Sequence, residues 1–470
     1  MYICSNCGGN LKFNISTQML GCEYCDTQVD PYSFEENQTT TTQTDTSQNT
    51  EFEATIFTCP QCGGEILSTD TSAAEFCSFC GASTILHSRI RKEKRPTYII
   101  PFKKTKEDCK NAYSQLMKHA PFVPNEFKDP KRIDGFRGIY MPYWAFHMTQ
   151  NEPFSFKGSK TYRHGDFIYT DHYALQGEID AYYRGLSYDA SSSFDDNISE
   201  KIAPYDIREM KPFTPAFLSG FYGDIADVSS EVYRNEAEQI ATENSIDAIY
   251  KTNAFSGFSM EGLTTNDSFI HTKTQKADSA MFPVWFMSYR NGDRVAYATI
   301  NGQTGKIVTD LPIDMAKYIK GSLLLAIPIF ILLNLFFTVI PQTLTMITIG
   351  ITLLAIILYQ MEISNIIKKE NGELDKGQQT KQQMRSNAER KQKAFPNGKK
   401  QGGFLACIIC IILSILIIVW NPASDLFYYG VVIASLLAVV ITFKDIMYYY
   451  NILATRKLPQ FNRTGGDDRA

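Results

Sequence analysis

Four Cys-x-x-Cys pairs in the first 80 residues limit what this chain can fold into more than any other feature. They form two sets, and each cysteine of the second set lies 55 positions after its counterpart in the first. A Gly-Gly dipeptide follows Cys7 in one copy and Cys62 in the other. This repeat indicates an internal duplication of one small module. The eight cysteines are Cys4, Cys7, Cys22, Cys25, Cys59, Cys62, Cys77 and Cys80.

The spacing of these cysteines predicts one metal centre in each copy. Two residues between paired cysteines allow one tight turn to aim both sulfurs at one ion, and the 14 residues between the pairs suit a β-hairpin. A segment of about 25 residues cannot bury a core large enough to fold unaided, so metal binding would supply the folding free energy. Because no leader precedes Cys4, we expect reduced thiols rather than disulfides. We therefore predict two zinc ribbons, with two structural zinc ions bound by the eight cysteines.

The charge of the N-terminal region favours a protein partner over nucleic acid. Residues 1–95 have 6 basic and 12 acidic side chains, and four thiolates around each zinc would add negative charge. The whole chain is close to neutral, with 46 Lys and Arg against 50 Asp and Glu. Such a surface repels phosphate. The basic run Arg89–Arg95 and a later basic loop nevertheless leave a membrane-tethered nucleic-acid-binding protein as the alternative.

Residues 98–314 have the pattern of a soluble α+β domain with antiparallel β meanders. Thr105-x-x-Asp108 is typical of a helix start, and the helix that follows would bury Cys109 as a core thiol. A second helix is predicted over about residues 229–251. The Asn-Gly pair at Asn291 predicts a turn within a three-stranded meander.

Two segments of this domain resemble each other around a Pro-x-Trp motif, 141–146 and 282–287. Their tryptophans, Trp144 and Trp285, are predicted to be aromatic core anchors rather than a ligand site. Asp195 and Asp196 are interpreted as a helix start.

A search for an active site in this domain gives weak candidates. His164 and His172 could meet Asp166 or Asp171 in a metal site, but exposed strand positions are the better interpretation. The glycines near Lys306 lack the spacing of a phosphate-binding loop. We therefore expect no catalysis and no small-molecule substrate, and a membrane enzyme that uses the two histidines is a third hypothesis.

Four apolar segments in the last third of the chain predict two transmembrane hairpins, since a bilayer core of about 30 Å needs about 20 apolar residues. No Asp, Glu, Lys or Arg lies centrally in them, which is typical of anchors rather than transporters. Cys407 and Cys410 are interpreted as small packing residues within the third segment. The lipid bilayer is thus a predicted partner.

Lys and Arg flank these segments on one side only, which predicts a multi-pass cell-membrane protein with both termini in the cytoplasm. The predicted fold class is multidomain: two tandem four-Cys zinc ribbons, a soluble α+β domain with antiparallel β meanders, and four transmembrane α-helices in two hairpins. The predicted parts are ribbon 1 at 1–32, a disordered Thr/Gln linker at 33–54, ribbon 2 at 55–87, a basic linker at 88–97, the soluble domain at 98–314, spans at 318–341, 343–361, 404–420 and 426–444, a basic cytoplasmic loop at 362–403, and a cytoplasmic tail at 445–470. The linker at 33–54 is expected to let the ribbons move separately.

The chain has Cys-x-x-Cys-Gly knuckles and further motif segments at 98–102, 139–144, 202–206, 217–221 and 301–306. In these it resembles a family of membrane-anchored, transcription-factor-IIB-type zinc-ribbon proteins of Gram-positive bacteria, over most of the first 315 residues. Such proteins are often labelled primosomal or helicase-like because of their cysteines. The resemblance implies a non-catalytic membrane component, with phage-shock or stomatin-like membrane proteins as partners.

Together these features predict a non-catalytic, membrane-anchored zinc-ribbon scaffold or adaptor. It would recruit a protein partner to the cytoplasmic face of the membrane, in envelope stress or membrane organisation.

Overall fold

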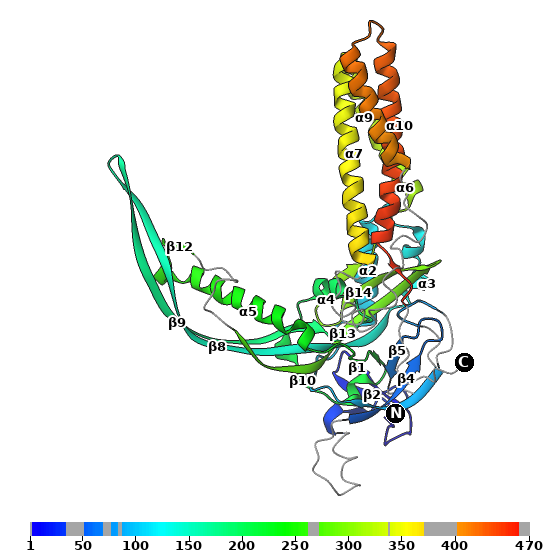
Figure 1. The fold of residues 1–470 in the computed structure, drawn as a ribbon. Helices are drawn as coiled ribbons and strands as arrows, with labels where there is room; N and C mark the ends of the chain where they lie inside the picture. Colours follow the sequence, from blue (N-terminus) through cyan, green and yellow to red (C-terminus); the bar gives the residue numbers. More distant parts are fainter. Residues whose placement is uncertain are drawn as a thin grey trace, which may run out of the picture.

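The computed structural model describes residues 2–33, 51–68, 77–82, 87–261, 272–336, 339–370 and 402–459. It has a small N-terminal sheet, a large sheet that carries helices, and a group of long apolar helices on one side of the large sheet (Figure 1). The predicted fold class is confirmed: two four-Cys clusters, a sheet-rich soluble region and four long apolar helices are all present.

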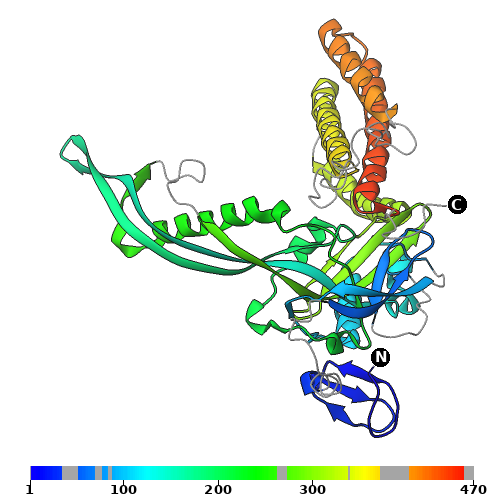
Figure 2. The same ribbon diagram turned by 60° about the horizontal axis from the view of Figure 1, so that its bottom comes forward.

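Ribbon 1 is a separate three-stranded antiparallel sheet, visible as a lobe at the N-terminus in Figure 2. The backbone N–H of Phe13 donates to the carbonyl of Ser219 at 3.0 Å, and the Phe13 and Phe217 rings meet edge to face at 5.1 Å. The lobe is therefore docked on the soluble domain, which differs from the expected independent movement, because Phe13 and its neighbours bury an apolar face there. Its strands are β1 (Leu11–Asn14), β2 (Met19–Cys22) and β3 (Gln28–Val29).

The centre of the large sheet is the antiparallel pair β8 (Arg137–His164) and β13 (Lys273–Asn291). The two Pro-x-Trp segments pair with each other here, with Met141 opposite Phe282. Both indole N–H groups donate to a backbone carbonyl at 2.8 Å, that of Trp144 to Val228 and that of Trp285 to Lys104. The predicted meander is confirmed in β13, β14 (Arg294–Asn301) and β15 (Ile307–Thr309).

Ribbon 2 belongs to the same sheet as the soluble domain. Strand β5 (Glu65–Ser68) pairs with β11 (Tyr222–Gly223), while β4 (Glu51–Thr58) pairs with β5 and β6 (His87–Lys94).

The predicted linker at 88–97 is corrected by this pairing: most of it is a strand, because its backbone completes the ladder with β4. The predicted linker at 33–54 likewise ends earlier, since β4 begins at Glu51, and most of that segment lies outside the described residues.

The predicted helices of the soluble domain are present. Helix α2 (Lys106–Lys118) begins with the expected capping box of Thr105 and Asp108, and Cys109 is buried in the core. Helix α5 (Glu231–Lys251) matches the second prediction. The shorter elements are α3 (Pro130–Ile133), α4 (Asp196–Ile202), β7 (Tyr98–Ile99), β10 (Lys211–Pro212), β12 (Ser259–Glu261) and the 3-10 turns η1 (Asn125–Lys128), η2 (Ile207–Glu209), η3 (Pro215–Leu218) and η4 (Asn253–Phe255).

A long curved arm extends from the sheet, formed by the outer part of β8 and by β9 (Phe167–Asp189) (Figure 1). Helix α5 lies along its concave side and buries Tyr233, Ala237 and Ile246 against the two strands. The arm continues past α5 and ends in a turn at Gly165.

Four helices are long and apolar enough to cross a membrane. They are α6 (Met315–Phe336), α7 (Pro341–Glu370), α9 (Gly402–Trp420) and α10 (Leu426–Leu453). Helices α7 and α10 continue beyond the predicted spans at 343–361 and 426–444, because Ile363 of α7 packs in one buried cluster with Tyr449 of α10. The predicted loop at 362–403 and tail at 445–470 therefore begin inside helices, and the rest of the loop, 371–401, lies outside the described residues.

Candidate metal centres

All four Cys-x-x-Cys pairs form the same backbone knuckle. The N–H of its fifth residue donates to the carbonyl of the first cysteine, and the N–H of that cysteine donates to the carbonyl of the sixth residue, at distances of 2.7–3.1 Å. The fifth residue has a positive φ in every knuckle, which explains why glycine follows the second cysteine in three of them. The fifth residues are Gly8 (φ 73°), Asp26 (φ 54°), Gly63 (φ 75°) and Gly81 (φ 71°).

The first centre joins Cys4 and Cys7 to Cys22 and Cys25. The Sγ atoms of Cys4 and Cys25 are 3.6 Å apart and those of Cys7 and Cys22 are 3.3 Å apart. Cys4 and Cys22 are buried, whereas Cys7 is exposed. The hydroxyl and backbone N–H of Thr27 lower the pKa of Cys25 to about 6, which favours the thiolate that a metal needs.

The second centre joins Cys59 and Cys62 to Cys77 and Cys80, and all four side chains are buried. The Sγ atoms of Cys59 and Cys80 are 3.8 Å apart, and those of Cys62 and Cys77 are 3.7 Å apart. The N–H of Gly64 also donates to the Cys62 sulfur at 3.4 Å. This centre is therefore part of the core of the large sheet.

Both centres fit a tetrahedral zinc ion. Four thiolates at about 2.3 Å from zinc would lie about 3.8 Å from one another, close to the paired distances here, and the four ligand atoms in each cluster lie within 4.8 Å of one another. Calcium and magnesium prefer oxygen ligands, so an all-sulfur set disfavours them. Four thiolates brought together and buried need a cation to offset their repulsion. With four protein ligands no coordination position stays open for substrate, so the metal would stabilise the fold.

The weaker candidates do not converge on a site. In the arm, His172 lies opposite Ser159 and His164 lies opposite Phe167, so the two histidines are separated along the strands. Across the described ranges of the chain, the two cysteine sets are the only metal-type clusters. Burial raises the pKa of Cys109 to about 12, as expected for a core thiol. Cys407 and Cys410 are buried among the long helices.

The three arginines of the basic run Arg89–Arg95 are engaged within the protein, whereas Lys92 and Lys94 are exposed. The guanidinium of Arg89 contacts Glu65 at 2.6 Å, and Arg91 forms ion pairs with Glu65 and Glu93. The guanidinium of Arg95 donates to the carbonyl of Phe213 at 2.8 Å. These contacts weaken the case for a phosphate-binding surface here.

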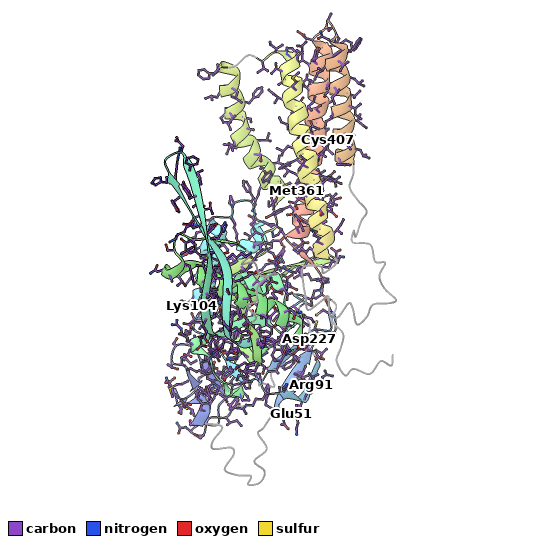
Figure 3. All side chains as sticks on the ribbon, turned by 60° about the vertical axis from the view of Figure 1, so that its left-hand side comes forward. Glu51, Arg91, Lys104, Asp227, Met361 and Cys407 are labelled. Carbon is purple, nitrogen blue, oxygen red and sulfur yellow. The ribbon has the colours of Figure 1, made fainter. Side chains whose placement is uncertain are left out.

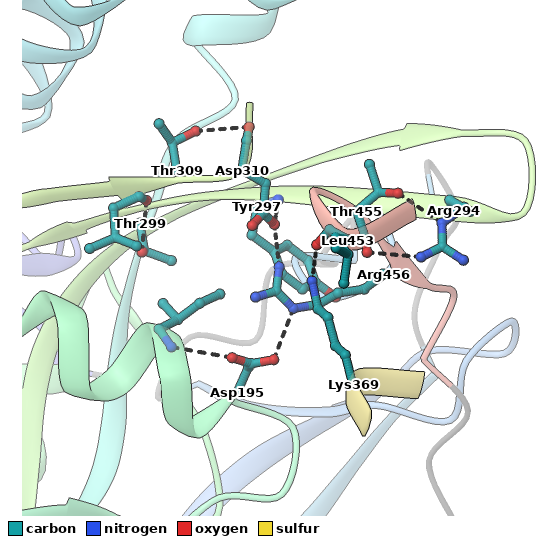
Figure 4. A network of polar contacts seen from close by, with 12 residues as sticks. Asp195, Arg294, Tyr297, Thr299, Thr309, Asp310, Lys369, Leu453, Thr455 and Arg456 are labelled. Atoms are coloured by element: carbon teal, nitrogen blue, oxygen red, sulfur yellow. Dashed lines mark hydrogen bonds and ion pairs between the residues drawn. The ribbon is translucent and has the colours of Figure 1, made fainter. Parts of the chain in front are cut away.

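A partly buried arginine that the sequence analysis did not single out joins the long helices to the large sheet (Figure 4). Arg456 lies in β16 (Arg456–Lys457), directly after α10, and β16 pairs with β14. Its guanidinium contacts Asp195 at 3.1 Å and also forms an ion pair with Asp310. Asp195 is thus both the predicted helix start and an ion-pair partner.

Burial raises and Arg456 lowers the pKa of both carboxyl groups. The arginine prevails at Asp195, whose pKa falls below its ordinary value, and burial prevails at Asp310, whose pKa is raised. Asp195 and Arg456 are 261 positions apart in the sequence and meet only in the folded protein. No local signal in the sequence could therefore have indicated this cluster.

A single tyrosine connects this cluster to the second metal centre. The Arg456 guanidinium lies 5.2 Å from the centre of the Tyr297 ring. The Tyr297 hydroxyl donates to the carbonyl of Phe79 at 2.7 Å, between the ligands Cys77 and Cys80. Tyr297 therefore contacts both Arg456, just after the end of α10, and the Cys77–Cys80 knuckle of the second candidate metal centre.

The chain is similar to the uncharacterized protein YdjG of Bacillus subtilis strain 168. The two are 29% identical over 321 residues, which cover 67% of this chain and 91% of YdjG. No protein-family profile matches the chain. No solved structure is similar to it.

Proposed function

We propose that this protein is a non-catalytic, membrane-anchored scaffold whose zinc ribbons recruit a protein partner, in envelope stress or membrane organisation. Its similarity to a protein of a Gram-positive bacterium agrees with the resemblance to membrane-anchored, transcription-factor-IIB-type zinc-ribbon proteins. That resemblance makes phage-shock or stomatin-like membrane proteins the first partners to examine.

The observation that carries the proposal is the connection from metal centre to membrane helix. Ribbon 2 shares its sheet with the soluble domain, and Tyr297 and Arg456 tie that sheet to the end of α10. The connection consists of buried structural contacts, and both metal centres are closed by four protein ligands. A soluble domain attached in this way is suited to holding a binding surface at a fixed position beside a membrane.

Ribbon 1 is the better candidate for the recruiting surface. It lies on the side of the large sheet away from the long helices (Figure 1), where a cytoplasmic partner could reach it. Tyr24 is 79% exposed and Ile3 is 53% exposed, while Asp26 and Asp30 are also exposed. An apolar spot among carboxylates fits a partner that offers a basic rim around an apolar residue.

The orientation proposed is that both termini and the soluble domain are cytoplasmic. Lys317, Lys320 and Lys444 lie at the ends of spans that face the soluble domain, which agrees with the positive-inside rule. A green fluorescent protein fused to the C-terminus would fluoresce in this orientation and stay dark in the opposite one.

The recruiting role is tested by in-cell crosslinking and purification of the full chain after nuclease treatment. Tyr24→Ser is compared with wild type and with Tyr250→Ser, which replaces another exposed tyrosine, on α5. We expect a specific protein to crosslink to wild type and to Tyr250→Ser but to be lost from Tyr24→Ser.

Equal capture by all three proteins would contradict recruitment through ribbon 1. Capture that disappears on nuclease treatment would instead favour the alternative, a membrane-tethered nucleic-acid-binding protein, whose binding should also weaken steeply with salt.

A further inference from the structure

The end of the β8–β9 arm carries large apolar side chains outside any core. Every residue from 160 to 174 is exposed, and we call residues 160–170 the hairpin tip. Within it Phe167 is 70% exposed, Ile168 is 73% exposed, and Tyr162 and Tyr169 are about half exposed. An exposed cluster of this kind commonly marks a surface that contacts another apolar phase or partner.

Three of these rings share one face of the hairpin. Tyr162 lies opposite Tyr169 and His164 lies opposite Phe167, and residues directly opposite each other point to the same face. The rings of Tyr162 and Tyr169 are stacked, with centroids 5.7 Å apart. Further down the same face, the Tyr173 ring meets Phe258 edge to face, and the Lys160 ammonium lies over the Phe258 ring. Beyond Lys160, every residue of the tip is exposed.

The tip rises on the same side of the large sheet as the long helices. Figures 1 and 3 differ by a turn about the vertical axis, so both preserve height. Both show the arm curving upward to the height of these helices, and Figure 1 shows its tip well apart from them. In Figure 3 the tip reaches the height of the labelled residues Met361 and Cys407.

That height corresponds to the edge of the expected bilayer core. Helix α9 has 19 residues and is about 28 Å long, which nearly equals the thickness of the core. The core therefore begins near Gly402, at the start of α9. The Tyr359 ring stacks on Phe404 at 5.2 Å, which places the nearby Met361 beside this start.

We propose that the hairpin tip lies in the headgroup region of the bilayer that the four helices cross, with Tyr162, Phe167 and Tyr169 against lipid. Tyrosine suits this region because its ring is apolar and its hydroxyl can remain hydrated. The exposed Arg163 lies beside the rings and complements lipid phosphates, while the Lys160 ammonium lies over the Phe258 ring at 4.1 Å. This contact is independent of any recruited protein and gives the soluble domain a second attachment to the membrane.

The same residues limit the depth of the contact. The side chain of Asp166 is fully exposed at the turn, 3.9 Å from Arg163, and this charged pair opposes entry into hydrocarbon. The outer edge of a two-stranded hairpin also has backbone groups that need water or another partner. The tip is therefore an interfacial anchor and does not span the membrane.

Quenching of an added tryptophan tests the proposal in the full chain. Phe167→Trp and, on the same face, Tyr169→Trp are each placed in nanodiscs that hold one protein copy, made with plain or acyl-brominated phosphatidylcholine. The emission of the native tryptophans is measured in the wild-type protein and subtracted from that of each variant. The matched control is Tyr24→Trp, an exposed position on ribbon 1.

We expect brominated lipid, with bromine near the headgroup, to remove most of the added emission at 167 and 169 and to leave that at 24 unchanged. Aqueous iodide should show the reverse order. The proposal would be overturned if the emission at both tip positions were quenched by iodide but not by brominated lipid. Protection from both quenchers would also overturn it, since it would show that protein covers the tip.

Discussion

At the residue scale, the metal centres depend on one backbone position in each knuckle, the residue of positive φ after the second cysteine. Three knuckles have glycine there and the fourth has Asp26. Aspartate and asparagine tolerate this conformation better than other residues with side chains, because their short polar groups bond locally. The Cys-x-x-Cys-Gly pattern therefore predicts the knuckle conformation correctly, and Asp26, the one residue here that is not glycine, also has a positive φ.

Gly8 offers a clean test, since a Cβ placed there would meet nothing within 4 Å. Gly8→Val should cost about 1–2 kcal/mol from conformation alone, which corresponds to about tenfold weaker zinc binding at the first centre. Gly8→Asn should stay close to wild type. Competition with a chromophoric zinc chelator measures both variants, and equal retention of zinc by wild type and Gly8→Val would refute this explanation.

At the element scale, the sequence predicted what local chemistry determines. The capping box of α2, the extent of α5 and the Asn-Gly turn between β13 and β14 depend on neighbouring residues, and each is present as predicted. The cysteine spacing likewise predicted the two groups of four cysteines that the structure brings together, because each half of a group is a local knuckle.

Strand pairings between distant segments were not predictable from a single sequence. Ribbon 2 joins the large sheet because Ser68 pairs with Tyr222, and β16 joins it because Arg456 pairs with Val295. Such contacts depend on the closure of very long loops, and alternation of residues does not specify the partner. For this reason the sequence alone predicts a linker at the basic run Arg89–Arg95, whereas the run forms most of β6 in the structure.

The attachment of α10 to the sheet predicts a loss of stability on removing one charge. Arg456→Met would leave Asp195 and Asp310 with only Lys369 as a nearby cation. Such a loss costs about 3–5 kcal/mol in fully buried pairs, and we expect a smaller cost in this partly buried cluster. We expect a clear fall in the midpoint of thermal unfolding of the purified full chain, with partial recovery in Arg456→Met/Asp310→Asn.

The matched control is Arg208→Met, whose exposed ion pair with Asp206 is screened by water and should contribute little to stability. If Arg456→Met and Arg208→Met melted alike, the ion-pair cluster would not be what holds α10 to the domain.

At the scale of the whole molecule, the two ribbons differ in position although they repeat one sequence pattern. Ribbon 2 is built into the sheet that is tied to the long helices, so loss of its metal should destabilise the soluble domain. Ribbon 1 is a docked lobe with its own sheet and an exposed Cys7, so loss of its metal should leave the rest folded. The proposal that ribbon 1 is the recruiting surface rests on this difference.

Metal analysis of the purified full chain tests most directly whether each ribbon binds a structural zinc ion. We predict two zinc ions per wild-type chain and one in Cys4→Ser/Cys7→Ser, which should keep the wild-type unfolding midpoint of the domain. Cys59→Ser/Cys62→Ser should also keep one zinc but melt at a clearly lower temperature. A folded wild-type chain with fewer than one zinc, or with its eight cysteines joined in disulfides, would contradict the account.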